Sequence, residues 1–336
     1  MSARQRIRAL VAGAGLIALV AACTPDLPEV DPDPEPSETM PVLDEPRLER
    51  VLDDIDAVIA EADEEDDTDV LATRMQDPAL TVRGAEYTLR AATADEEDPY
   101  TIQPLTTDDQ VAIVAASDEW PRTAMVVTEI PDEANVPLLI GLRQQDPQSP
   151  YRMFSWVRLL PGVTMPDTDI PESGSPEVAA DSEDFLVSPE QAVSQYADLL
   201  TEGGDSDYAD AFAEDVFREG FEQEVDALAE NIDDAGDFDH STVAEPEDTV
   251  AMATADGGVI VLGSMTTSQE FTKTEAEGEV NLGGHIAALS EEDGEVNETL
   301  TATYDLMVGF YVPAFADDAQ TTVLGVERVL SGVEES

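Results

Sequence analysis

Few side chains in this 336-residue chain are suited to chemistry, since it holds one cysteine and two histidines. Cys23 is the single thiol, so an intrachain disulfide or a site of several thiolates cannot form. His240 follows an acidic loop and His285 lies in a glycine-containing stretch, but neither has the spacing of a zinc helix or an EF-hand. Ser264 follows Gly263 without a nucleophile elbow, and no phosphate-binding glycine loop is present.

Tyr87, Tyr304 and Asp305 are the remaining candidates for acid–base chemistry, which would require burial to tune their proton affinity. Packing is the simpler interpretation of a tyrosine on a strand. Trp120 and Trp156 suit either a sheet core, which we favour, or a partner surface. The sequence therefore predicts no catalytic residue, no cofactor and no metal site, and we do not expect an enzyme.

Cys23 ends an apolar run, residues 9–22, that three arginines precede. These are the parts of a secretory signal, and the run is shorter than the roughly 20 apolar residues of a membrane span. Val20-Ala21-Ala22-Cys23 resembles the lipobox of bacterial lipoproteins. The resemblance implies cleavage between Ala22 and Cys23 and lipidation of the Cys23 thiol, so we expect a lipid anchor on the outer face of the cell membrane. An ordinary signal peptide or signal anchor is the alternative.

Acidic residues dominate the composition, with 76 Asp and Glu against 15 Lys and Arg and a formal net charge of −61. Removal of residues 1–22 would make it −64. Such a surface repels nucleic acid phosphates, so a nucleic acid partner is excluded. The charge favours solubility in an exposed or salty environment; bound cations or basic proteins are the alternative. Hydrophobic residues reach 42%, which is enough to build a core.

Shifts in composition predict five segments. Residues 1–22 form the signal peptide, 23–46 an acidic proline-rich tether, 47–165 a first module, 166–187 an acidic linker and 188–336 a second module. In each module helical periodicity comes first and strand-like runs follow. We expect strands near 110–115, 122–130, 136–143 and 151–160, and later near 250–254, 258–268, 300–312 and 321–333. Ser188 opens the second module's first helix as a capping box.

Two displaced matches indicate an internal repeat. Residues 52–61 match 193–202 at a displacement of 141, and residues 158–163 match 328–333 at a displacement of 170. Each module thus begins with a matched helix and ends with a matched strand. This order predicts an α+β class with helices packed on one face of an antiparallel sheet.

The order and length of these elements resemble the cystatin-like, nuclear-transport-factor-2-like superfamily. That resemblance implies two tandem modules, each with helices on a curved antiparallel sheet, which could pair as an internal pseudo-dimer. The whole chain also resembles uncharacterised lipoproteins of high-GC Gram-positive bacteria, through the lipobox, the tether and the Trp156–Gly162 strand before an acidic linker. Neither resemblance supplies an activity.

These observations together predict a cell-envelope lipoprotein anchored through Cys23, acting as a non-enzymatic binding or assembly component with a protein partner of unknown identity. One alternative is a solute- or cation-binding lipoprotein that serves a permease. The other is an isomerase- or hydrolase-like enzyme with a pocket in the cone of one module.

Overall fold

The computed structural model describes residues 39–132, 134–315 and 319–336. Cys23, the predicted signal peptide and most of the predicted tether lie outside these residues, so the anchoring prediction stays a prediction. Residues 39–336 form one compact unit. In the part of the chain that the structure describes, no helix combines the length and apolar character needed to cross a bilayer.

Nine strands form one closed barrel in the order β1-β2-β3-β4-β9-β8-β7-β6-β5. All neighbours are antiparallel except β1 and β5, which run parallel. The strands are β1 (Asp109–Ala116), β2 (Arg122–Thr128), β3 (Leu138–Gln144), β4 (Arg152–Leu159), β5 (Ser175–Val178), β6 (Gly236–Ala253), β7 (Val259–Lys273), β8 (Thr299–Val312) and β9 (Thr322–Glu335).

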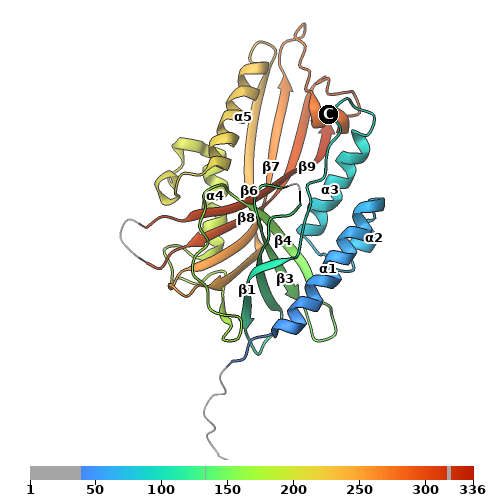
Figure 1. The fold of residues 1–336 in the computed structure, drawn as a ribbon. Coiled ribbons are helices and arrows are strands. Elements are labelled where there is room, and N and C mark those ends of the chain that lie inside the picture. Colours follow the sequence, from blue (N-terminus) through green and yellow to red (C-terminus); the bar gives the residue numbers. More distant parts are fainter. Residues whose placement is uncertain (1–38, 133, 316–318) are drawn as a thin grey trace, which may run out of the picture. The chain divides into compact units, whose positions relative to one another are not determined.

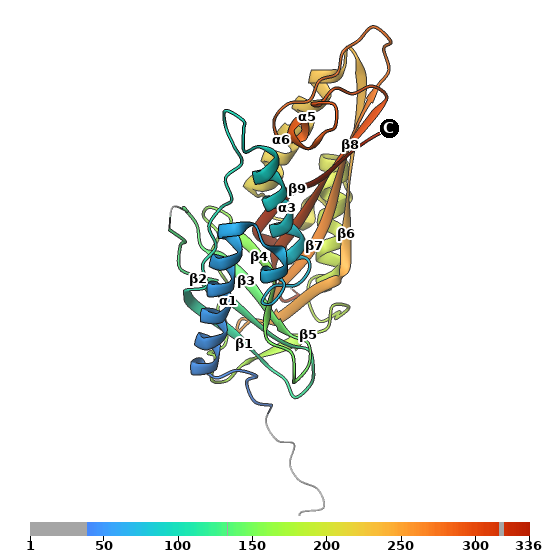
Figure 2. The same cartoon turned by 90° about the vertical axis from the view of Figure 1, so that its right-hand side faces the viewer.

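The predicted fold class, two tandem cystatin-like α+β modules, is wrong, because the chain folds as a mostly β barrel (Figures 1 and 2). The last strand expected in each module does not belong to a sheet of its own. Instead β4 pairs with β9 through Arg158–Val326 and Leu159–Gly325. The expected linker, residues 166–187, contains β5, which pairs with both β1 and β6 and completes the barrel.

A glycine permits the close approach of β4 and β9. A Cβ atom at Gly325 would lie 2.6 Å from the carbonyl oxygen of Arg158 and 2.9 Å from a methyl group of Val157. Any larger residue would therefore push the two strands apart. The pairing of β4 with β9, which joins the two halves of the sequence, therefore requires glycine at position 325.

Among the described residues, six helices pack against the strands. They are α1 (Glu45–Glu65), α2 (Thr68–Leu71), α3 (Ala79–Ala92), α4 (Pro189–Glu202), α5 (Val216–Ile232) and α6 (Gly284–Leu289), with short 3₁₀ turns at Gly203–Asp205 and Ala209–Ala211. The predicted capping box of α4 is confirmed, since Ser188 and Gln191 exchange side-chain and backbone hydrogen bonds. Asp44 caps α1 by accepting a hydrogen bond from the Arg47 amide.

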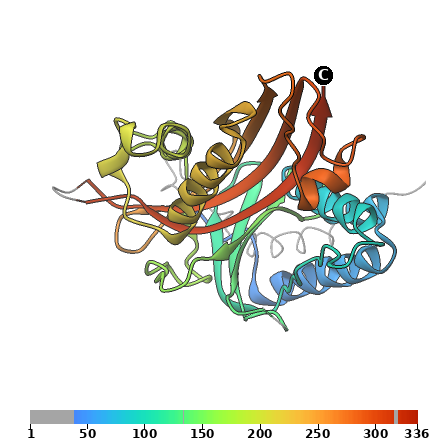
Figure 3. The same cartoon turned by 90° about the horizontal axis from the view of Figure 1, so that it is seen from above.

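The part of the long sheet β6–β9 around residues 259–265 of β7 is covered on both faces (Figure 3). Helices α4 and α5 pack on one face, where Val261 and Phe310 are buried. The other face, with Leu262 and Met307, joins the core formed by α1, α3 and β1–β4. Residues 259–265 of β7 are consequently all buried. A strand without apolar and polar alternation is typical of a sheet that is buried on both sides.

Candidate functional site

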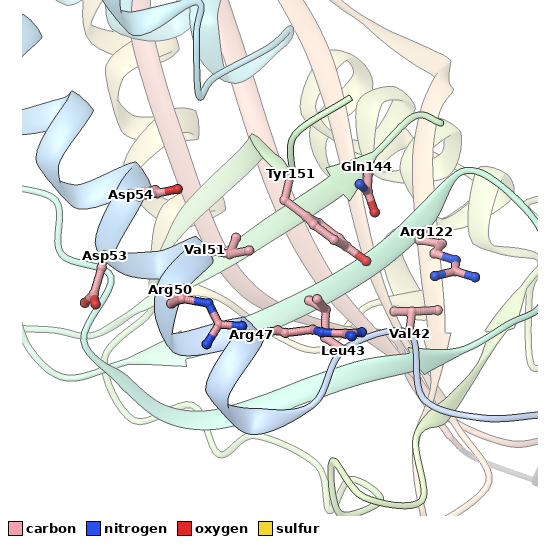
Figure 4. Close-up of a pocket in the computed structure, with 10 residues that line it drawn as sticks. All are labelled: Val42, Leu43, Arg47, Arg50, Val51, Asp53, Asp54, Arg122, Gln144 and Tyr151. Atoms are coloured by element: carbon pink, nitrogen blue, oxygen red, sulfur yellow. The ribbon is translucent and has the colours of Figure 1, made fainter. Parts of the chain in front are cut away.

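A pocket of about 460 Å³ lies between the beginning of α1 and the ends of strands β2–β4 (Figure 4). Its volume falls within the roughly 300–1,000 Å³ that is common for small-molecule sites. Three arginines, a tyrosine, a glutamine and two carboxylates supply its polar groups: Arg47, Arg50, Arg122, Tyr151, Gln144, Asp53 and Asp54. Three cationic side chains at one pocket are notable in a chain with 15 Lys and Arg against 76 acids.

Two regular elements place these side chains. Arg50 and Val51 follow Arg47 by three and four positions on α1, so both lie beside it on the helix face that borders the pocket. On the sheet, Arg122 lies directly opposite Gln144 in the β2–β3 register, so their side chains project to the same face. Tyr151 immediately precedes β4 and completes the wall.

Acidic side chains do not neutralise the pocket. Of its two carboxylates, Asp54 accepts a hydrogen bond of 2.8 Å from Arg74 and is thereby occupied. Asp53 and Asp54 both lie on the side of the pocket away from the Tyr151 hydroxyl and Arg122 (Figure 4). Arg47 is 3.7 Å from Asp44 in an exposed pair, which water and salt screen.

Arg122 has no carboxylate partner among the described residues. Its guanidinium lies 4.2 Å from the ring centroid of Trp120, which supports the cation without neutralising it. Its Nε is buried and has no hydrogen-bond partner in that part of the chain. The Arg122 side chain is therefore positioned by packing, with its charge available to a ligand.

Tyr151 provides the most informative atom of the pocket. The residue is 6% exposed, and its hydroxyl is buried without a hydrogen-bond partner among the described residues. Burial raises the pKa of Tyr151 to about 12, while the nearby Arg122 acts in the opposite direction. The hydroxyl is thus a neutral donor at physiological pH. Leaving such a group unpaired costs about 1–3 kcal/mol, a cost that a ligand with an acceptor atom would remove.

A second polar group lies between α1, α3 and the sheet, and it is fully paired. Arg83 is buried and binds Glu86 at 2.7 Å and also Asp63. The Tyr87 hydroxyl donates to Asp63 at 2.6 Å, and the Tyr100 hydroxyl donates to Glu86 at 3.1 Å. Tyr87, one of the candidates for acid–base chemistry, therefore serves as a hydrogen-bond donor that joins α3 to α1.

Glu327 on β9 extends this buried charge cluster. It accepts a hydrogen bond of 3.1 Å from the Trp156 indole and forms an ion pair of 3.1 Å with Arg158. Burial raises the pKa of Glu327 to about 7; Arg158 opposes this shift and Glu86 adds to it. Because these two contacts join β4 to β9, they hold the first half of the chain to the second.

Neither histidine lines the arginine pocket, and each has an aromatic neighbour. The His240 Nε2 is 3.2 Å from the carbonyl oxygen of Leu200, and its ring stacks on Phe238. His285 is at the beginning of α6 and touches the edge of the Tyr100 ring. Among the described residues, no group of three or more His, Cys, Asp or Glu side chains is arranged to hold a metal ion.

The other strand candidates also have structural partners. Tyr304 lies beneath the Arg328 guanidinium, 3.9 Å from its ring centroid. Asp305 accepts a hydrogen bond of 3.4 Å from Thr266, and Ser264 donates one of 2.8 Å to Asp248. The structure brings none of them together with Tyr87.

Sequence reasoning missed the arginine pocket. A signal did exist, because nine of the 15 Lys and Arg residues lie between Arg47 and Arg158. It could not be interpreted without the fold, because Arg50 and Arg122 are 72 positions apart and belong to a helix and a strand.

Comparison with known proteins places the chain in a family without an assigned role. A family model described as "Domain of unknown function (DUF8094)" matches residues 39–332. No curated protein and no solved structure matches the chain.

Proposed function

Because the chain belongs to the DUF8094 family of unknown function, we propose a role from its own residues: a non-enzymatic, lipid-anchored binding protein of the cell envelope that takes a small anionic ligand. The main support for an anionic ligand is the buried Tyr151 hydroxyl, which has no partner among the described residues and lies in a pocket with three arginines. The anchor rests on the lipobox-like Val20–Cys23 stretch, which precedes the described residues.

The chemistry of the pocket selects carboxylates or phosphates. A guanidinium offers a planar pair of donors that matches the two oxygens of either group. Arg122 supplies this pair beside the neutral Tyr151 donor, and Arg47 and Arg50 face them from α1. A polymer such as nucleic acid is disfavoured by the net charge of −61, whereas a small ion can enter a locally positive pocket.

A solute-binding role that serves a permease is the second candidate function. The same pocket favours it, since its volume suits a small solute. A cation as the solute is disfavoured at this pocket because three guanidinium groups would repel it.

Anion binding can be tested with the full-length protein in a neutral detergent. Citrate and inorganic phosphate, added at constant ionic strength, should raise the melting temperature by mass action. Arg122→Gln should weaken the binding of the effective anion about tenfold or more, because a charge-assisted contact is lost. Arg218→Gln, the same charge change on α5, is the matched control. An equal response of both variants to every anion would refute the proposal.

The anchor has a separate test. Cys23→Ala should release the protein from membranes or leave an uncleaved precursor, because stable anchoring needs two acyl chains and both would be lost. Membrane fractionation with metabolic lipid labelling measures this result. A Cys23→Ala protein that is still processed and membrane-bound would remove the anchor from the proposal without affecting the pocket.

A further inference from the structure

Strand β1 has one edge that is only partly used. Its residues 109–114 pair with β2 on one side. On the other side β5 reaches it only at Ala115 and Ala116. Among the described residues, no loop forms a backbone hydrogen bond with residues 109–114 along this second edge. Backbone donors and acceptors are therefore available there for another strand.

A groove of about 790 Å³ runs along this part of β1. The beginning of α1 and residues 168–172 form its other walls, and Figures 1 and 2 both place the start of α1 beside β1. Met40, Val111 and Ile170 line it with side chains that are 68%, 45% and 62% exposed. They are three of the few large apolar side chains that the described residues leave exposed, and they gather at one groove.

The rim of the groove is acidic. Five carboxylates line it, against the single cation Arg47: Asp44, Glu45, Asp109, Asp169 and Glu172. An occupant must therefore carry positive charge as well as apolar side chains. The chain's own tether, which is rich in Asp and Glu, and a second copy with a net charge of −61 do not meet this requirement.

We propose that this groove binds an extended segment of a partner protein, in which apolar side chains alternate with Lys or Arg, by addition of a strand to the free edge of β1. In this mode backbone hydrogen bonds provide affinity, and alternate side chains provide specificity. The apolar side chains of the segment would cover Val111 and Ile170, while its cations would face Asp109, Asp169 and Glu172. The groove shares Leu43 and Arg47 with the anion pocket, but its strand edge and acidic rim are separate from it.

Three synthetic peptides of equal length can test this binding mode on the full-length protein in a neutral detergent, with fluorescence anisotropy as the readout. The first alternates valine with lysine, the second alternates valine with glutamate, and the third is the lysine peptide with alternate backbone amides N-methylated. We expect the lysine peptide to bind, and each of the other two to bind at least about tenfold more weakly.

Variants locate the binding site. Ile170→Lys should weaken the lysine peptide about tenfold, because it removes apolar contact and adds a like charge. Val243→Lys, a similarly exposed position on β6, is the matched control and should not change affinity. Arg122→Gln should also leave peptide affinity unchanged, which separates this result from the outcome for the anion pocket.

Three outcomes would overturn the proposal. The N-methylated peptide could bind as well as its parent, which would show charge attraction without strand pairing. Ile170→Lys could bind the lysine peptide as well as Val243→Lys does. Finally, light scattering could show a dimer that Ile170→Lys dissociates, which would assign the groove to a second copy of the chain.

Discussion

Arg328 and Arg122 occupy comparable positions but have opposite surroundings. Each is on a barrel strand, and each guanidinium lies over an aromatic ring, at 3.9 Å from Tyr304 and 4.2 Å from Trp120. Arg328 also donates to both oxygens of Glu224, at 2.7 and 2.9 Å. Arg122 has no such carboxylate among the described residues. The charge of Arg328 is used to hold α5 on the sheet, and the charge of Arg122 is left for a ligand.

The two halves of the sequence also differ in how many carboxylates are available to each cation. Residues 166–336 contain three Lys and Arg among 43 acids, whereas residues 47–165 contain nine among 25. A cation in the second half is surrounded by potential partners, so a free one would be difficult to maintain. Acids are fewest in residues 134–166, which contain one acid, Asp146, and which supply Gln144 and Tyr151 to the pocket.

Glu327 in the paired charge cluster should give the largest effect. Because its pKa is about 7 when folded and near 4.3 when unfolded, the folded state binds the proton more tightly. This contribution is complete below about pH 4 and is lost as the pH rises through 7, to a total of about 4 kcal/mol at most. Glu327→Gln should therefore flatten the fall in unfolding free energy between pH 5 and pH 8, measured by urea titration.

Glu334→Gln provides the control for this measurement, since Glu334 is on the same strand and is exposed. It should retain the pH dependence of the original protein. A Glu327→Gln variant with an unchanged pH slope would show that Glu327 is ionised throughout this range.

Replacing the two compared arginines should give the next largest difference. Arg328→Met should lower the unfolding free energy by about 2 kcal/mol, because Glu224 loses its charged partner. The loss is smaller than for a fully buried pair, since the Glu224 side chain is 37% exposed and remains partly solvated. Arg122→Met should cost less than about 1 kcal/mol, since its contact with Trp120 is lost but no carboxylate partner among the described residues is. Equal losses in denaturant titration would mean that Arg122 has a structural partner and that the contrast is wrong.

Two tyrosine hydroxyls, one unpaired among the described residues and one paired, should change the unfolding free energy in opposite directions when they are removed. Tyr151→Phe removes a hydroxyl without a partner among the described residues and should raise the unfolding free energy by about 1 kcal/mol, while it weakens anion binding. Tyr196→Phe removes a hydroxyl that donates to Asp215 at 3.1 Å and should lower it by about 1 kcal/mol. Thermal unfolding of the two variants measures both signs. A destabilised Tyr151→Phe protein would show that the hydroxyl is already satisfied.

Local signals in the sequence predicted many individual elements correctly. The capping box at Ser188, the four strands near 110–160 and the strands near 300–333 all occur in the structure. They could be predicted because capping, hydrophobic periodicity and turn residues depend on residues only a few positions apart in the sequence. The first part of β6 was missed because charged and polar residues such as Asp237, Asp239 and Glu245 interrupt it. Sheet pairing with β7 stabilises that strand despite its weak propensity.

The candidate site was beyond the reach of the same signals. Arg50, Arg122 and Tyr151 have no common spacing, and an arginine on a helix is usually solvated. Only the approach of α1 to the ends of β2–β4 converts them into one pocket. The absence of a partner for the Tyr151 hydroxyl among the described residues is likewise a tertiary fact, because it depends on what lies around the side chain and not on its neighbours in sequence.

Composition and local interactions account for the scarcity of cations, the single thiol, most strands and the capped helices. How the strands join depends on contacts between residues far apart in the chain. The similarity of residues 158–163 to 328–333 indicated two separate modules, yet β4 and β9 pair with each other and close one barrel. Strand pairing across more than 160 residues is set by contacts such as Gly325 against Arg158, and no local pattern encodes them.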